Sequence, residues 1–331
     1  MPVLFLPKPA ATKGTEESIS AMQETPNTVK NDRKIILSGA SGMLGSALRD
    51  ALASRNQPIL TLVRRHPTSL TELQWDPTSH PAIPIPDALE NVSAAIHLSG
   101  SNVAAHRWTP AFKREIIESR VQSTRALSTA LAALRNPPQT LLVASAAGIY
   151  GNRNGQLLDE SSTPGSGFLA DVCRQWEAAA QPAVQAGIRV VHLRFGVVIG
   201  PGHGALAKML PIFRLGLGGP LGSGQQWMSW ISLTDAVSAI LFLLETPAIE
   251  GPVNLTAPSP VTNAQFTRAL AQAIHRPAIL PAPAFALRLA LGEMADEALL
   301  SSARVYPSRL ISAGFQFTHP AIAQALSAAL A

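Results

Sequence analysis

Short apolar runs alternate with amphipathic stretches along most of the chain, beginning at Lys34. KIILSG is an apolar run that ends in glycine, and leucines then recur four residues apart at Leu44, Leu48 and Leu52, as on one face of a helix. Further runs of strand length follow in PILTLVRR, AAIHLSG (94–100), QTLLVAS, RVVHLRFGVVIG and GPVNLTA. This alternation predicts an α/β fold, a Rossmann-type doubly wound parallel sheet.

Helix signals lie between these runs. The longest predicted helix covers 109–134, with Thr109 as its N-cap and Pro110 in its first turn. A second is GFLADVCRQWEAAAQPAVQ, and a third follows Ser232 or Thr234, either of which can cap it.

The composition and the periodicity of the sequence change twice along the chain, which suggests domain boundaries. Residues 1–33 lack periodicity and predict a loose, disordered tail. Residues 34–200 predict the main sheet domain, completed by about 228–258. The Gly-rich stretch 201–227 and the Pro-broken helices of 259–331 predict an interleaved, smaller C-terminal substrate lobe and module.

Composition narrows the classes of protein. Hydrophobic residues make up 47% of the 331 positions and charged ones 14%, which excludes a disordered chain for most of the length. The net charge of +5 is mild, and no basic block exceeds Arg64–Arg65, which argues against nucleic-acid binding. A single cysteine, Cys173, fits a reducing compartment, and no apolar run reaches the ~20 residues of a membrane span. We therefore expect a cytoplasmic protein without a membrane partner; the oligomeric state stays open.

The segment GASGMLG carries the strongest motif. It places Gly39, Gly42 and Gly45 between a strand and a helix, where glycines allow a tight turn, approach of a pyrophosphate and close helix–strand packing. The helix N-terminus then offers N–H groups and a positive dipole to phosphate. We expect the cofactor to contact these three glycines and the loop residues between them, Ser41, Met43 and Leu44.

Two arginines end the second predicted strand. Arg64 lies 19 residues beyond Gly45, where an NAD-binding protein would carry an acid for the ribose 2′-hydroxyl. Arginine binds a 2′-phosphate instead, so Arg64 and Arg65 favour NADP over NAD. The alternative is two solvated arginines at a strand end.

Taken together, the motifs resemble the extended short-chain dehydrogenase/reductase superfamily, and more narrowly its atypical, NAD-dependent epimerase/dehydratase-like "epimerase family" branch. The resemblance rests on GASGMLG, HLSGSNVAAHRW, SAAGIYG, RFGVVIGPGHGAL and RVYPSRLISAGFQF, and it extends from residue 34 to 330. It implies an NADP-binding sheet, a substrate lobe and a small C-terminal module.

The resemblance also implies further cofactor contacts. By position, Leu98, Ser99 and Gly100 pass beside the cofactor, and Val198 meets its nicotinamide side. Glu115 and Arg120, on the long helix, reach the ribose or the phosphates; for Glu115 a surface helix charge is an equal alternative.

The catalytic pattern of the superfamily is broken. Most members pair a tyrosine with a lysine on one helix, the lysine lowering the pKa of the phenol. The matching positions here hold Leu169 and Cys173. Tyr150 and Ser145 remain as candidate proton donors; the alternative is that Tyr150 lines the nicotinamide cleft and Ser145 packs at a strand end. Lys208 is the lysine that could reach the cleft.

Two functions stay open. One is an NADP-dependent oxidoreductase or epimerase of an unknown small or sugar-like substrate. The other is a non-catalytic NADP(H)-binding sensor or regulatory protein. Histidine spacing and the single cysteine predict no metal site. Residues 216–230 predict either a mobile pocket wall with Gln225, Gln226, Trp227 and Trp230, or a surface loop with docked tryptophans.

Overall fold

Strand β1 (Ile35–Ser38) lies inside a parallel sheet, with all four residues buried. The structure is a computed structural model that describes residues 1–2, 33–79, 82–83 and 86–331. The sheet has seven strands in the order β11 (Gly251–Leu255), β7 (Arg189–Phe195), β5 (Thr140–Ala146), β4 (Ala94–His97), β1, β2 (Ile59–Val63) and β3 (Glu72–Gln74). The doubly wound parallel fold is therefore confirmed. The predicted tail, 1–33, lies outside the described residues apart from its two ends.

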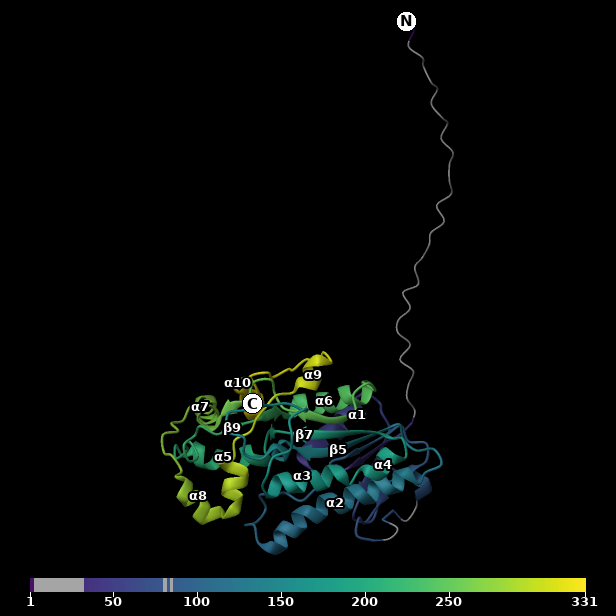
Figure 1. Cartoon of the computed structure of the whole chain (residues 1–331), viewed down its shortest axis with the longest axis horizontal. Helices are drawn as coiled ribbons and strands as arrows, with labels where there is room; N and C mark the ends of the chain where they lie inside the picture. Colours follow the sequence, from purple (N-terminus) through teal and green to yellow (C-terminus); the bar gives the residue numbers. More distant parts are fainter. Residues whose placement is uncertain (3–32, 80–81, 84–85) are drawn as a thin grey trace. The chain divides into compact units, whose positions relative to one another are not determined.

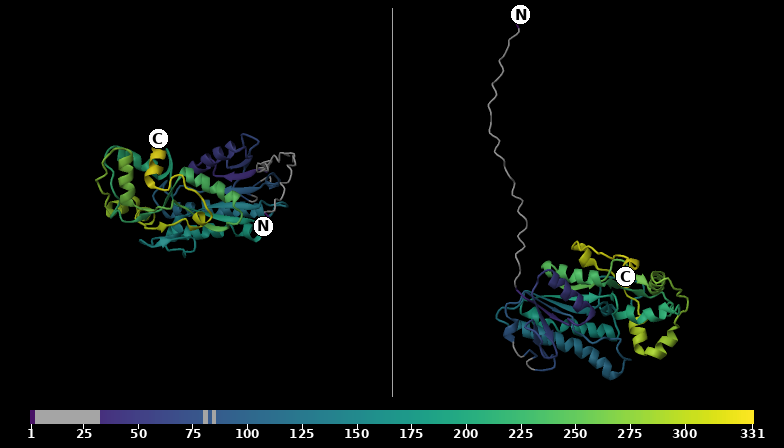
Figure 2. Two further views of the ribbon diagram at one scale, coloured as in Figure 1. Left: turned by 90° about the horizontal axis from the view of Figure 1, so that it is seen from above. Right: turned by 180° about the vertical axis from the view of Figure 1, so that it is seen from behind.

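Helices cover both faces of the sheet (Figure 1). On one face lie α1 (Met43–Ser54) and α6 (Leu233–Glu245), and on the other α2 (Pro110–Ala132), α3 (Phe168–Ala178) and α4 (Gln181–Gln185). The view from behind in Figure 2 shows the same layers. Each face has its own apolar core, built from alternate side chains of the buried strands.

Caps fix where two of these helices begin. The Thr109 side chain accepts a hydrogen bond from the Phe112 N–H, with Pro110 in the first turn, as the sequence predicted. Ser232, the first of the two expected caps, accepts from the Asp235 N–H at the start of α6. The buried Asp235 carboxylate also accepts from the N–H groups of Thr318 and His319, which ties α6 to the C-terminal segment.

Two predicted elements differ in detail, and one strand of the sheet was not predicted. The run 189–200 is two strands, because Gly196 passes so close to the Ser229 backbone that a Cβ there would lie 2.7 Å from its oxygen. Strand β8 (Val197–Ile199) then pairs with β10 (Trp230–Ser232) outside the main sheet. The helix after Gly167 is split into α3 and α4 before Pro182, and β3 was not predicted.

A second group of elements lies at one end of the sheet in Figures 1 and 2. Its helices are α5 (Gly204–Arg214), α7 (Asn263–Ala273), α8 (Ala284–Leu291) and α10 (Ile322–Leu330). Helix α9 (Ser308–Ser312) instead packs against β11, and its Leu310 belongs to the core under α1 and α6. Its short strands are β6 (Leu157–Leu158), β9 (Trp227–Met228), β12 (Val261–Thr262) and β13 (Arg304–Val305). Helices α5, α7 and α10 share a separate core with β8 and β10. The chain enters this region, returns to the sheet through α6 and β11, and leaves again; the exact domain boundaries stay a prediction.

Candidate active site and cofactor cavity

The turn between β1 and α1 has the geometry of a phosphate-binding loop. Gly39 has φ +74°, and a Cβ there would lie 2.7 Å from the Leu98 carbonyl carbon. Gly45 packs so tightly that a Cβ would lie 2.1 Å from the Gly39 oxygen. The expected structural roles of these two glycines, the tight turn and the close packing, are confirmed.

Gly42 differs from its two neighbours because the space in front of it is open. A Cβ at this position would have only the Gly39 oxygen near it, at 3.5 Å. Gly42 is also the N-cap of α1 and brings no side-chain cap, so the first N–H groups of the helix remain for another acceptor. A negatively charged group is favoured at such a helix start.

A cavity of about 860 Å³ opens at this loop. Nine of the predicted cofactor residues line it: Gly39, Ser41, Gly42, Arg64, Arg65, Leu98, Ser99, Gly100 and Glu115. The other five, Met43, Leu44, Gly45, Arg120 and Val198, do not. The structure thus brings the ends of β1, β2 and β4 and one face of α2 together around a single space, and contact with a cofactor stays a prediction for all fourteen.

The two arginines after β2 have different surroundings. Arg65 is held by Glu72 on β3, with Nη2 2.5 Å and Nη1 2.8 Å from the carboxylate oxygens. Hydrogen bonds from Arg65 and Thr68 lower the pKa of Glu72 to about 2. Arg64 makes no hydrogen bond or ion pair with any residue that the structure describes. Its guanidinium is therefore available to a ligand in the cavity.

Helix α2 contributes a row of polar residues that the sequence did not single out. Glu118, Ser119 and Gln122 follow Glu115 at helical spacing and line the cavity with it. Glu115 accepts a hydrogen bond from the Ser101 hydroxyl at 2.9 Å, so it orients the loop after β4. Their three- and four-residue spacing from Glu115 was the sequence signal that could have predicted that they share one face of α2.

Arg120 and Val198 do not line the cavity. Arg120 donates to the carbonyl oxygens of Ser101 and Ile116, and its guanidinium stacks on Trp176. Val198 pairs with Ile231 between β8 and β10. Both support the surrounding backbone in this structure.

Tyr150 is fully buried at the end of the short helix that follows β5. Its hydroxyl donates to Asn254 Oδ1 at 2.8 Å and accepts from Arg194 Nη1 at 3.0 Å. Burial raises the pKa of Tyr150, and the Arg194 charge offsets this only in part. In this structure Tyr150 therefore does not line the cavity, because distant polar groups close around its hydroxyl. A role of Tyr150 as a proton donor stays a prediction.

Ser145 belongs to the same buried network. Its side chain donates to Glu177 Oε1 at 2.7 Å, and Glu177 forms two hydrogen bonds with Arg194. Burial alone would raise the pKa of Glu177, but the Arg194 contacts outweigh it and hold that pKa below its ordinary value. Like Tyr150, Ser145 is buried, with only 2% of its surface exposed to solvent.

The positions of the missing tyrosine and lysine lie side by side on α3. A Cβ on Gly148 would lie 3.5 Å from Leu169 Cβ and 4.0 Å from Cys173 Sγ. Burial raises the pKa of Cys173 to about 12, so this thiol stays neutral, a small buried group as expected. Glu297, from the C-terminal region, accepts a hydrogen bond from the Leu169 N–H at 3.1 Å.

Two further predictions from the sequence concern Lys208 and the stretch 216–230. Lys208 donates to the Ala104 carbonyl oxygen, which fastens α5 to the loop before α2. In the stretch 216–230, Trp230 is fully buried and Gln226 donates to two backbone oxygens, while Gln225 is exposed. For Trp230, the structure therefore agrees with the second of the two predictions, a loop whose tryptophan is docked in the core.

Among the described residues, no group of three or more His, Cys, Asp or Glu side chains could hold a metal ion. None of the helices described is long and apolar enough to cross a membrane.

Residues 35–255 match the model of the NAD dependent epimerase/dehydratase family, and residues 282–329 match a domain of unknown function, DUF1731. The chain belongs to the NAD dependent epimerase/dehydratase family. The family match covers the sheet and the phosphate loop, and the second match covers the predicted C-terminal module.

Relatives share most of this chain. An "Epimerase family protein" of Mycobacterium bovis is 48% identical over 88% of the chain and 96% of its own length. The Bos taurus epimerase family protein SDR39U1 is 35% identical over 90% and 100%. A crystal structure of human SDR39U1 with NADPH has a TM-score of 0.82 and 31% identity, covering 89% of this chain and 98% of that one.

Proposed function

We propose that the protein binds NADP(H) in the cavity at the β1–α1 turn. The observation that carries the proposal is the open space at Gly42, next to a helix start and inside a cavity that also contains Arg64. A diphosphate fits there because a side chain at Gly42 would occupy its place, and the N–H groups of α1 would hold it. The NADPH in the human relative and the family's NAD dependence support the same assignment.

The preference for NADP over NAD rests on the residues around the adenosine side. Arg64 has a free guanidinium, whereas Arg65 is held in place by Glu72. Asp76 also lines the cavity, but its Oδ1 accepts from the Thr78 N–H and hydroxyl, which lower its pKa together with the Arg64 charge. A 2′-phosphate would therefore meet the Arg64 guanidinium, which makes no hydrogen bond with the described residues, beside the ionised carboxylate of Asp76.

We further propose oxidoreductase or epimerase chemistry on a small substrate, without a tyrosine–lysine pair. Bound cofactor would supply hydride exchange with a substrate carbon. The residues at the usual proton-transfer positions, Leu169 and Cys173, cannot assist, since one is apolar and the other a neutral thiol. Proton exchange would fall to water or to the substrate's own groups.

The absence of a usable tyrosine–lysine pair also favours a second candidate. In this candidate the protein binds NADP(H) without turnover and signals to a partner that the cofactor is bound. The buried hydroxyls of Tyr150 and Ser145 support this candidate, because neither can reach a substrate in this conformation. A screen of carbonyl and alcohol substrates that follows NADPH absorbance separates the two. Turnover with any substrate supports the enzyme; stoichiometric binding without turnover supports the sensor.

Fluorescence titration with NADPH and NADH tests the cofactor proposal. We expect NADPH to bind at least about tenfold more tightly, and Arg64→Ala to remove most of that difference. Arg55→Ala is the matched control, because Arg55 is an exposed arginine that pairs with Glu245 and does not line the cavity. Equal affinities for both nucleotides, unchanged in Arg64→Ala, would remove the 2′-phosphate argument.

We retain a cytoplasmic location as a proposal, supported by the buried free thiol of Cys173. A relative from Arabidopsis thaliana, 35% identical, carries the word chloroplastic in its name. Fractionation of cells that express the tagged full chain tests the location.

A further inference from the structure

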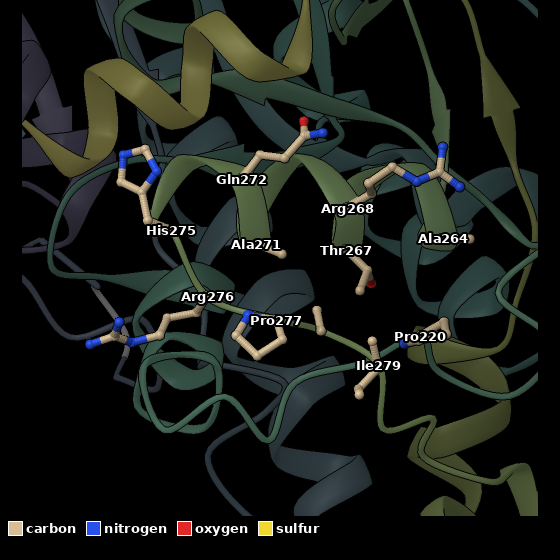
Figure 3. A pocket seen from close by; sticks show the side chains of 11 residues that line it. Pro220, Ala264, Thr267, Arg268, Ala271, Gln272, His275, Arg276, Pro277 and Ile279 are labelled. Carbon is tan, nitrogen blue, oxygen red and sulfur yellow. The ribbon is translucent and has the colours of Figure 1, made fainter.

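Two cavities of this structure differ in how their polar side chains are arranged. One, of about 770 Å³, lies beside α7, and Figure 3 shows the side chains of Arg268, His275 and Arg276 pointing to opposite sides of it and away from it. These side chains therefore do not converge on one ligand. The cofactor cavity, by contrast, has a buried histidine, His97, in contact with residues of its wall.

His97 joins several elements that border the cofactor cavity. It is the last residue of β4 and is fully buried; it does not line the cavity itself, whereas residues 98–100 do. Its Nδ1 lies 2.6 Å from the hydroxyl of Ser38, the residue before the phosphate loop, and its Nε2 lies 3.1 Å from the Ser123 hydroxyl on α2. Trp75, which follows β3, meets the imidazole edge-on, with ring centroids 5.8 Å apart. Ser123 and Trp75 both line the cavity.

The hydrogen bonds of Ser123 determine which nitrogen of His97 carries the hydrogen. Ser123 Oγ donates to the Ser119 carbonyl oxygen, 2.7 Å away, as serines inside helices commonly do. Because a hydroxyl has a single hydrogen, Ser123 accepts from His97, so Nε2 carries the hydrogen and donates it. Nδ1 is then the acceptor, and the Ser38 hydroxyl donates to it. Ser38, His97 and Ser123 thus form one directed chain of hydrogen bonds, the His97 network.

A neutral imidazole fits this network. Burial lowers the pKa of His97 to about 3, so the ring is uncharged at neutral pH. A neutral ring has one donor and one acceptor nitrogen, and here each has one hydroxyl as its partner. Removing the Ser38 hydroxyl would leave Nδ1 buried without a donor, a loss that the surrounding backbone can reduce only by moving.

The two ends of the His97 network belong to two walls of the cofactor cavity. Ser38 ends β1 and leads directly into the turn at Gly39. On α2, Ser119 lies one turn before Ser123, and its hydroxyl accepts from the Ser101 N–H in the loop after β4. The network therefore links the phosphate loop to the α2 wall. Binding groups must be held to within about 0.5 Å by such supporting hydrogen bonds.

We propose that His97, with its hydrogen on Nε2, is a positioning residue for cofactor binding. It holds the phosphate loop, the α2 wall and Trp75 in the relative positions that a dinucleotide requires, and it does not touch the cofactor. This inference rests on the proposed binding of NADP(H) in this cavity. A histidine that served folding alone would change stability without changing nucleotide affinity.

The first test compares Ser38→Ala with Ser128→Ala in the full chain. Both serines are fully buried and neither lines the cavity, but the Ser128 hydroxyl donates to the Ala179 carbonyl oxygen at the end of α3. Fluorescence titration should show NADPH binding at least about fivefold weaker in Ser38→Ala, and within about twofold of the wild type in Ser128→Ala. Thermal melting in the same buffer establishes that both variants are folded during the titration. Equal NADPH affinity of the wild type and both variants overturns the proposal.

The second test reads the tautomer of His97 in the wild type and needs no nucleotide. Nitrogen NMR of protein labelled at its histidines should show a protonated Nε2 and an unprotonated Nδ1 for His97 at pH 7. A hydrogen on Nδ1 would contradict the directed network and overturn the proposal.

Failure of this inference can be told apart from failure of the proposed function. A wild type that binds no NADPH refutes the cofactor assignment, whatever the tautomer of His97. A wild type that binds NADPH, with unchanged affinity in Ser38→Ala, refutes only the positioning role of His97.

Discussion

Arg194 and Glu177 are joined by two hydrogen bonds inside the protein, Nε to Oε1 at 2.8 Å and Nη2 to Oε2 at 2.9 Å. The pair is 7% and 13% exposed, and it links β7 to α3 beneath the region where the catalytic pair of related enzymes would lie. Ser145 and Tyr150 both bind to it. The pair therefore organises the polar core behind the candidate active site.

Removing one partner of this pair should destabilise the fold strongly. Arg194→Met leaves the Glu177 carboxylate buried and unpaired, so we expect the free energy of unfolding to fall by about 3–5 kcal/mol in urea denaturation. The control is Arg174→Met, which breaks an exposed pair with Asp171 and should cost less than about 1 kcal/mol. Equal, small losses in both variants would show that the buried pair has no special role.

The glycines of the phosphate loop should separate folding from binding. Gly42→Ala places a methyl group in the open space, so the protein should keep its melting temperature and lose at least about tenfold in NADPH affinity. Gly45→Ala forces a Cβ against the Gly39 oxygen and should lower the melting temperature first. Calorimetry and thermal melting measure the two effects. A Gly42→Ala variant with wild-type NADPH affinity would contradict the proposed phosphate site.

Buried His97 should make stability depend on pH. The imidazole lies between the Ser38 and Ser123 hydroxyls, at 2.6 and 3.1 Å, and burial lowers its pKa to about 3. Unfolded histidine has a pKa of about 6.5, so below that pH the unfolded chain binds one more proton. The contribution of neutral His97 to the free energy of unfolding is therefore fully present above pH 6.5. It falls by about 1.4 kcal/mol per pH unit as the pH drops toward 3.

The comparison with His97→Gln isolates that contribution. Urea unfolding between pH 6 and pH 4 should give a slope of unfolding free energy against pH that is smaller by about one proton in the variant than in the wild type. Identical slopes would mean that the folded protein protonates His97 as readily as the unfolded chain does. An absolute loss of stability in the variant at pH 7 does not affect the comparison.

Tyr150→Phe tests the buried tyrosine. The change leaves Asn254 Oδ1 and one Arg194 N–H without their partner, so we expect a loss of about 1–3 kcal/mol in unfolding free energy. NADPH affinity, measured by fluorescence, should stay within a few-fold of the wild type. If a substrate is found and Tyr150→Phe abolishes its turnover without loss of folded protein, the interpretation of Tyr150 as a structural residue fails.

Local patterns were sufficient for much of the fold. The apolar runs and their glycine ends located six of the seven sheet strands, and Thr109 and Ser232 capped the helices they were expected to cap. Strand β3 was missed because three residues carry too little periodicity to be recognised. The break at Gly196 was missed because the Ser229 backbone that approaches it comes from a distant part of the chain.

The sequence by itself determined the succession of strands and helices along the chain, the phosphate loop and the arginines after β2. Turn geometry and strand period act over a few neighbouring residues, so they can be recognised without the fold. Only the tertiary structure decided that Arg65 is paired while Arg64 is free, and that Ser145 and Tyr150 are enclosed. The Tyr150 hydroxyl meets Asn254 from 104 positions away and Arg194 from 44. Whether a side chain faces solvent, a ligand or the core depends on such distant partners, which the chain brings together only when it folds.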